Sequence, residues 1–189
     1  MPITGRREHI IKTAIDLFCE HGFHATGVDL IMREAKVSKK TMYNHFRSKD
    51  ELILAALRQY DSLFRNNFVK QLEEIADTPK DKLLAIFDVC DNWFNSQNFF
   101  GCMFINVVGE YSSPDSPFRD ISKQFKSLMK SYILNLSEEA GADDPQKLAS
   151  EIGILLEGAI VTAQVSQDPN AARNAKEMAK VILLNRIPD

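Results

Sequence analysis

The sequence predicts an all-α protein of about nine helices, with an N-terminal three-helix head and a C-terminal helical body. Apolar residues recur at helical spacing, as Ile11, Ala14, Ile15 and Phe18 do near the N-terminus. A capping side chain followed by proline occurs four times, a pattern typical of helix starts. No alternating apolar and polar run with hairpin turns is present, so a β-sheet is not expected. With 189 residues, 44% hydrophobic and 26% charged, the chain has a globular composition and can bury a sizeable core.

Short-range signals place the first four helices. Gly22 is positioned to end the first helix in the left-handed conformation. Thr26 and Ser38 resemble the N-caps of two short helices. Ser48 and Glu51 form a capping box at the start of a helix of about 27 residues, which spans about 40 Å at 1.5 Å per residue. These helices are expected over residues 6–21, 26–35, 38–46 and 49–75.

Proline marks most of the later helix starts. A proline at the first helical position costs no hydrogen bond, because its missing N–H has no partner there in any case. The side chains that precede such a proline, and can cap the helix, are Thr78, Ser116, Asp144 and Asp168. The later helices are therefore expected over residues 79–96, 102–111, 117–140, 145–166 and 169–186.

The net charge of −3 conceals two regions of opposite sign. Residues 1–50 contain nine Lys/Arg and six Asp/Glu, a net charge of +3. Residues 51–189 contain 14 Lys/Arg and 20 Asp/Glu, a net charge of −6. A basic head on an acidic body favours a polyanion as the partner of the head, although chance scatter would give the same totals.

Several functional classes are not expected. The cysteines are Cys19, Cys90 and Cys102, an odd set without a C-x-x-C pair, so neither a disulfide framework nor a zinc site is predicted. No apolar run approaches about 20 residues and no secretory signal is recognised, which predicts a cytoplasmic protein without a membrane segment. The chain has no phosphate-binding loop, dinucleotide fingerprint, zinc-protease motif or nucleophile elbow, and its histidines all lie in the head. We therefore expect no enzyme, no metal and no cofactor.

Residues 26–49 have the format of a helix-turn-helix, in which the second helix enters the DNA major groove. Met42 and Phe46 are spaced to face the first short helix, which leaves polar and basic side chains for DNA. Lysine and asparagine can read base edges, whereas tyrosine and histidine suit phosphates. The alternatives are a solvated surface for the lysines, a capping role for Thr26, and packing for Tyr43 and His45. The candidate DNA contacts are Thr26, Ser38, Lys39, Lys40, Thr41, Tyr43, Asn44, His45 and Lys49.

Two segments, Phe18–Val28 and Val37–Leu52, resemble the DNA-binding domain of tetracycline-repressor-like (TetR) regulators. The family pattern is close to F-x-x-x-G-[YF]-x-x-[TS]-[TS]-[VI], followed by G-V-[ST]-x-[GP]-x-[LIM]-Y-x-[HY]-F-x-[ST]-K-[DE]-x-L. The resemblance implies a homodimeric repressor with a DNA-binding domain over residues 1–48 and a ligand-binding and dimerisation domain over 49–189. Lys36 stands where the family has a turn glycine, so this lysine is expected at positive φ. Lys40 and Met32 also depart from the family pattern, which puts the operator and the packing of the two short helices in doubt.

An aromatic-rich stretch in the body suggests either an effector pocket or a hydrophobic core. Asn106 is a polar residue on an otherwise apolar helix, so it could orient a ligand or bond a neighbouring helix end. Cys102 could sense oxidants, but no basic neighbour in sequence would activate its thiol. The candidate effector contacts are Tyr60, Phe64, Phe68, Phe87, Cys90, Trp93, Phe94, Phe104 and Asn106.

The last two predicted helices carry apolar stripes with small residues, which suit helices that pack against their symmetry mates. Ordinary packing within the chain is the alternative. The candidate dimer contacts are Ile152, Leu155, Leu156, Ala159, Ala163, Ala175, Met178 and Ile182.

Together these features predict a ligand-responsive DNA-binding regulator. The expected form is a homodimeric repressor that binds double-stranded operator DNA with an inverted repeat and is released by a small apolar or aromatic effector. The alternative is a helical small-molecule sensor without a DNA role, against which the basic head and the 38–46 helix argue.

Overall fold

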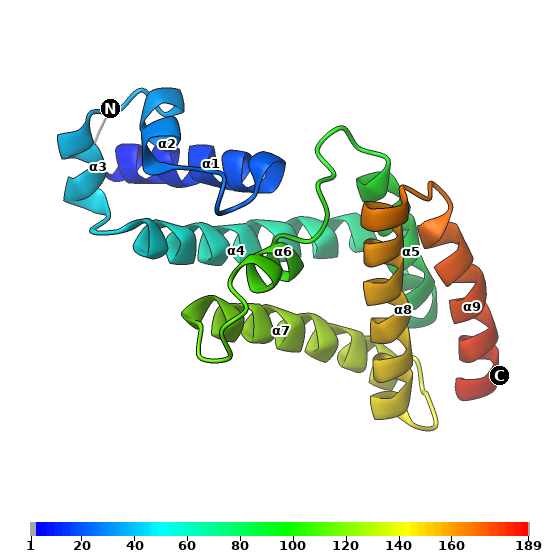
Figure 1. The fold of residues 1–189 in the computed structure, drawn as a ribbon. Helices are drawn as coiled ribbons and strands as arrows, with labels where there is room; N and C mark the ends of the chain where they lie inside the picture. Colours follow the sequence, from blue (N-terminus) through cyan, green and yellow to red (C-terminus); the bar gives the residue numbers. More distant parts are fainter. Residues whose placement is uncertain (1–2, 189) are drawn as a thin grey trace. The chain divides into compact units, whose positions relative to one another are not determined.

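The computed structural model describes residues 3–188, and over this range the chain forms nine α-helices and no strand, as predicted (Figure 1). Each helix lies within a few residues of its expected bounds. The helices are α1 Ile3–His21, α2 Val28–Glu34, α3 Lys39–His45, α4 Lys49–Ile75, α5 Pro79–Phe94, α6 Met103–Glu110, α7 Pro117–Glu139, α8 Pro145–Ser166 and α9 Ala171–Arg186.

Four predicted N-caps are confirmed. The side chains of Ser38, Ser48, Thr78 and Asp144 accept hydrogen bonds from the backbone N–H three residues later, at 3.2, 3.1, 3.1 and 3.0 Å. The prediction for Thr26 was wrong, because Gly27 is the N-cap of α2 and makes no side-chain cap bond. The Thr26 hydroxyl donates instead to the carbonyl of Gly22 at 2.6 Å.

Helix α9 begins later than the proline signal predicted. Asp168 accepts a hydrogen bond from the N–H of Asn170 at 2.8 Å, so its carboxylate caps a turn rather than a helix. Pro169 lies in that turn, and α9 starts at Ala171. The proline therefore shapes the connection from α8 instead of occupying the first helical position.

One packing unit comprises the chain up to Phe64 together with Cys102–Phe125. It contains α1, α2, α3 and α6 and parts of α4 and α7. In the head, α2 packs on α1, and Phe23 stacks on Phe18 with ring centroids 4.8 Å apart. Gly22, just before Phe23, has φ 82°, which confirms the left-handed conformation predicted for the end of the first helix.

The other packing unit comprises Arg65–Gly101 and Lys126–Asp189. Its centre is formed by α5, α8 and α9, which contact one another pairwise, and α8 and α9 lie side by side in Figure 1. Three ion pairs fasten α9 to these partners: Lys176 with Asp88, Arg173 with Asp91, and Arg186 with Glu151, at 2.6, 3.3 and 2.7 Å. The predicted boundary after residue 48, between a DNA-binding domain and a ligand-binding and dimerisation domain, stays a prediction.

Helix α8 is the one described helix that is long and apolar enough to cross a membrane, with a mean hydropathy of 1.4 over its most apolar window. Core helices of soluble proteins pass the same test, so this composition is weak support for a membrane segment. Within its unit, α8 packs against both α5 and α9.

Candidate functional site

The turn between α2 and α3 has the geometry that the sequence required. Lys36 adopts φ 53°, the left-handed conformation expected of a residue at the family's glycine position. The N–H of Val37 donates to the carbonyl of Met32 at 3.0 Å, which closes the turn. His9 on α1 lies 3.1 Å, measured from its Nε2, from the carbonyl oxygen of Ala35. The turn is therefore held from both of its ends and from α1.

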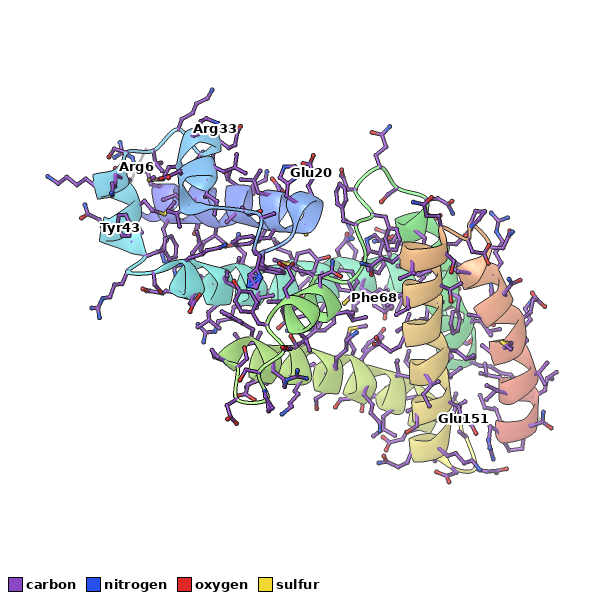
Figure 2. The ribbon with its side chains drawn as sticks, in the orientation of Figure 1. Arg6, Glu20, Arg33, Tyr43, Phe68 and Glu151 are labelled. Atoms are coloured by element: carbon purple, nitrogen blue, oxygen red, sulfur yellow. The ribbon has the colours of Figure 1, made fainter. Side chains whose placement is uncertain are left out.

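Helix α3 presents two different faces. Met42 and Phe46 are almost completely buried, as their spacing predicted. Tyr43, labelled in Figure 2, remains 48% exposed. The other side chains on the solvent side of α3 are Lys39, Lys40 and Asn44. The exposed α3 face, defined as Lys39, Lys40, Tyr43 and Asn44, thus combines two cations with an aromatic hydroxyl and an amide.

Ser38 and Thr41 are already engaged at the start of α3. The Ser38 Oγ lies 3.0 Å from the Thr41 Oγ1 and accepts from the Thr41 N–H at 3.2 Å. His45 is half-buried, with its ring centroid 6.4 Å from that of Phe46. Of these three predicted contacts, only Ser38 is fully on the surface, and its hydroxyl serves the helix N-terminus.

Thr26 and Lys49 bond the loop that follows α1. Thr26 is completely buried, so its side chain is not available to DNA. The Lys49 ammonium donates to the carbonyl of Phe23 at 2.6 Å. Burial lowers the pKa of Lys49 below its usual value, and the nearby carboxylate of Glu110 opposes this effect. Both residues therefore stabilise the loop after α1.

Two exposed cations beside α3 were missed by the sequence reasoning. The guanidinium of Arg7, on α1, lies 5.1 Å from the centroid of the Phe46 ring, which places a positive charge next to α3. Arg47 follows Phe46, the C-cap of α3, and is exposed. Its position next to the predicted helix was the available signal, whereas nothing local in the sequence joins Arg7 to Phe46.

Some predicted effector contacts form an aromatic cluster in the first packing unit. Phe104 stacks on Phe125 with ring centroids 4.0 Å apart. Tyr60 lies 5.9 Å from Phe104, and Phe64 lies 5.9 Å from Phe125, again between ring centroids. Burial raises the pKa of the Tyr60 phenol, which therefore stays protonated. Asn106 is half-buried on α6, and Phe125 is a member that the prediction missed.

The other predicted effector contacts lie in the second packing unit. Phe68, Phe87 and Cys90 are buried there. Trp93 and Phe94 form a second aromatic cluster with Phe99, with ring centroids 4.9–5.6 Å apart. A cavity of about 190 Å³ lies beside Phe94 and Phe99. That all nine predicted residues form one pocket stays a prediction.

The predicted dimer contacts divide by burial. Most of them are buried within the chain's own packing, so the intrachain alternative accounts for Ile152, Leu156, Ala159, Ala163 and Ala175. Leu155 and Ile182 are half-buried, and Met178 is exposed. A different apolar stripe faces outward on the same two helices. We call it the α8–α9 apolar surface; its members are Ile154, Val161, Val165, Met178, Val181 and Leu184.

Metal or redox chemistry would depend on the cysteine, histidine and acidic side chains. All three cysteines are free thiols, and the described part of the chain contains no group of three His, Cys, Asp or Glu residues that could hold a metal. Burial raises the pKa of Cys19 to about 12 and raises that of Cys90 as well.

Comparison with known proteins matches two family models. Residues 10–56 match the bacterial regulatory proteins of the tetR family, and residues 79–179 match the tetracyclin repressor-like C-terminal domain. The HTH-type transcriptional regulator YxaF of Bacillus subtilis is 26% identical, over 86% of each chain. The HTH-type transcriptional repressor NemR of Escherichia coli is 24% identical, over 94% of this chain and 93% of NemR. A crystal structure of a TetR-family transcriptional regulator from Streptomyces coelicolor superposes with a TM-score of 0.89, 25% identity and coverage of 98% and 97%.

Proposed function

The chain belongs to the TetR family of transcriptional regulators, and we propose that it is a repressor that binds an inverted-repeat operator as a homodimer and releases it on binding an effector. The observation that carries this proposal is the exposed α3 face. It lies on the second helix of a helix-turn-helix, where base edges are read.

The chemistry of the exposed α3 face suits DNA. Lys40 can donate to guanine O6 and N7 or to phosphate, and Asn44 can pair with adenine through two hydrogen bonds. The exposed Tyr43 hydroxyl is a phosphate donor. Arg7 and Arg47 add positive charge next to Phe46, at the C-terminal end of α3.

The α8–α9 apolar surface supports the homodimer. Its six large apolar side chains lie on two helices that contact one another, and a surface of this kind is typical of an association site. A two-fold axis brings the same surface of each copy together. Two copies of α3 about 34–36 Å apart would then read successive major grooves of an inverted repeat.

The two aromatic clusters support an apolar or aromatic effector. Each cluster is a separate candidate for the site that contacts this effector. One contains Tyr60, Phe64 and Phe104, and the other contains Trp93 and Phe94. The relative named as a repressor, NemR, supports repression as the direction of control. A regulator that binds operator DNA would act in the cytoplasm, where that DNA lies.

Selection of binding sites from a random DNA pool tests the proposal. The purified protein should enrich one inverted repeat. Asn44→Ala should reduce the preference for one base in each half-site, by about 1–3 kcal/mol of binding free energy. Tyr43→Ala should weaken binding to all sequences equally, because phosphate contacts carry no sequence information. Asn98→Ala, an exposed asparagine outside the head, is the matched control and should change neither property.

An absence of any enriched sequence would refute DNA recognition and leave the sensor alternative. If an operator is found, compounds that release it can be screened. Phe64→Ala and Phe94→Ala then test the two clusters separately, because each removes one ring from one cluster. The variant that changes the concentration needed for release identifies the cluster that contacts the effector. Unchanged release in both variants would refute both clusters.

A further inference from the structure

Glu110, the last residue of α6, binds the loop that follows α1. Its Oε1 accepts the N–H of Phe23 at 2.8 Å, and its Oε2 accepts the N–H of His24 at 2.6 Å. Both atoms of one carboxylate are thus used on two consecutive backbone amides. We propose that Glu110 is a positioning residue for DNA binding, which couples α6 to the head and sets the position from which α3 meets the operator. This inference rests on the proposed function.

The loop is shaped to receive the carboxylate. Gly22 has φ 82°, and a Cβ at this position would lie 2.9 Å from the Glu110 Oε1. A larger residue here would strain the turn and push the carboxylate away from its present position. The signal that ends α1 in the sequence also creates the binding site for Glu110.

The same loop is held from its other side by α4. The Phe23 carbonyl accepts from the Lys49 ammonium at 2.6 Å, while the Phe23 N–H donates to Glu110. Residue 23 is therefore held through both of its backbone polar groups, by side chains of opposite charge. Hydrogen bonds to ionised groups are stronger than neutral ones, so this clamp favours one position of the loop.

Neighbouring contacts extend the clamp to α2. The His24 ring packs on the ring of Tyr111, next to Glu110, with centroids 4.4 Å apart. Two residues further on, the buried Thr26 hydroxyl donates to the carbonyls of Gly22 and Leu17, at 2.6 and 3.2 Å. Helix α2 begins at Val28. A shift of the Glu110 carboxylate would therefore move the loop that leads into the helix-turn-helix.

Helix α6 connects Glu110 to the aromatic cluster. It has eight residues, so Phe104 and Glu110 lie on the same short segment. Phe104 and Val107 are buried, and Phe104 belongs to the aromatic cluster that is one candidate for effector contact. A ligand that changed the packing of Phe104 would displace Glu110, since both lie on one short helix. Coupling of this kind requires a ligand whose affinity differs between the original and the displaced position of α6.

The test compares the full-length protein with Glu110→Gln and Glu110→Asp, using the operator selected by the wild type. Glutamine keeps the size of the side chain but presents an NH₂ group to one of two N–H donors. Aspartate keeps the charge but is too short by one methylene to reach both amides. Asp115→Asn, an exposed acid in the following loop, is the control for loss of one negative charge.

Affinity is measured for full operators that differ in the spacing of their half-sites. This measurement distinguishes a role of Glu110 in positioning the head from a role in stabilising it. Both Glu110 variants should bind the full operator about 5–10-fold more weakly, at the low end of the range for coupled sites. They should also tolerate changed spacing that the wild type rejects, and should bind a single half-site with unchanged affinity. Amide hydrogen exchange should be faster at residues 23 and 24 in both variants, with unchanged protection of α3.

Three results would overturn the assignment. Equal weakening on half-sites and full operators would show that Glu110 only stabilises the head. Wild-type behaviour of Glu110→Asp would show that charge alone matters, not the two-amide clamp. Wild-type spacing selectivity in Glu110→Gln would remove the positioning role while leaving the proposed function intact. If the wild type itself selected no DNA, the proposed function would fail first and the assignment with it.

Discussion

Replacing Leu184 by alanine should weaken the proposed dimer by about 300-fold. Leu184 is 73% exposed on α9 and is a member of the α8–α9 apolar surface. Leucine has three more carbon groups than alanine, worth about 0.8 kcal/mol each when buried, or about 2.4 kcal/mol in all. Scaling by the 73% exposure gives about 1.7 kcal/mol for each copy. Leu184 occurs once in each copy of a two-fold dimer, so the loss of association free energy doubles to about 3.4 kcal/mol. This loss raises the dimer dissociation constant by about 300-fold.

Sedimentation equilibrium over a range of protein concentrations measures the dimer dissociation constant directly. Leu63→Ala is the matched control, because Leu63 is 58% exposed on α4 and lies outside the α8–α9 apolar surface. The control should leave the dissociation constant unchanged, and neither variant should alter the helix content. A wild type that stays monomeric at micromolar concentration would refute the argument. So would equal effects of the two leucine substitutions.

Three further predictions concern the folded protomer. Met42→Ala should destabilise it by about 2–5 kcal/mol in urea unfolding, because this buried side chain joins α3 to the rest of the head; a change below 1 kcal/mol would contradict that role. The hydrogen bond from Arg186 lowers the pKa of Glu151 below its usual value of about 4.5, so the carboxylate stabilises the fold above that pH and the stabilisation is lost as the pH falls through the folded-state pKa. Glu151→Gln should therefore flatten the decline of the melting temperature at acid pH, and an unaltered decline would refute the assignment. Because burial raises the pKa of Cys19 and Cys90, iodoacetamide at about pH 8 should label both far more slowly in the native protein than in urea, as mass spectrometry would show.

Local signals predicted the helices well, because the residues that start and end a helix act within a few positions. Ser38 and Asp144 cap the helices that they were expected to cap. Lys36 takes positive φ because the geometry of the turn requires it regardless of residue type. Thr26 failed as a cap because a threonine before a helix looks the same in sequence whether its hydroxyl binds the helix or the preceding carbonyls.

Helix α8 shows why periodicity could not tell its buried stripe from its exposed one. It carries two apolar stripes, one through Ile152 and Leu156 and another through Ile154, Val161 and Val165. Both have helical spacing, and only the positions of α5 and α9 decide which stripe is buried within the chain. Most residues predicted for the dimer lie on the stripe that is buried within the chain, and their contact with a second copy stays a prediction.

Glu110 illustrates a second limit. In the sequence it is one acidic residue at the end of an apolar helix, and its partners Phe23 and His24 lie 87 and 86 positions earlier. No local pattern joins such groups, since the fold alone brings them together. The exposed α3 face was predictable because its residues lie on one short helix, whereas the clamp on the loop after α1 was not.

Helix α9 has an unusual distribution of side-chain sizes, with consequences for how this protein can diverge from its relatives. Its inward side is built mainly from alanines, such as Ala175 and Ala179, whereas Met178, Val181 and Leu184 face outward. The inward positions leave no room for larger residues, so they tolerate little change without loss of the protomer fold. The outward positions can change size and shape while the protomer stays intact. In a cell that contains several regulators of this architecture, such changes could keep their subunits from forming mixed dimers. Two subunits whose outward residues do not match in shape would lose the contacts that stabilise a matched pair.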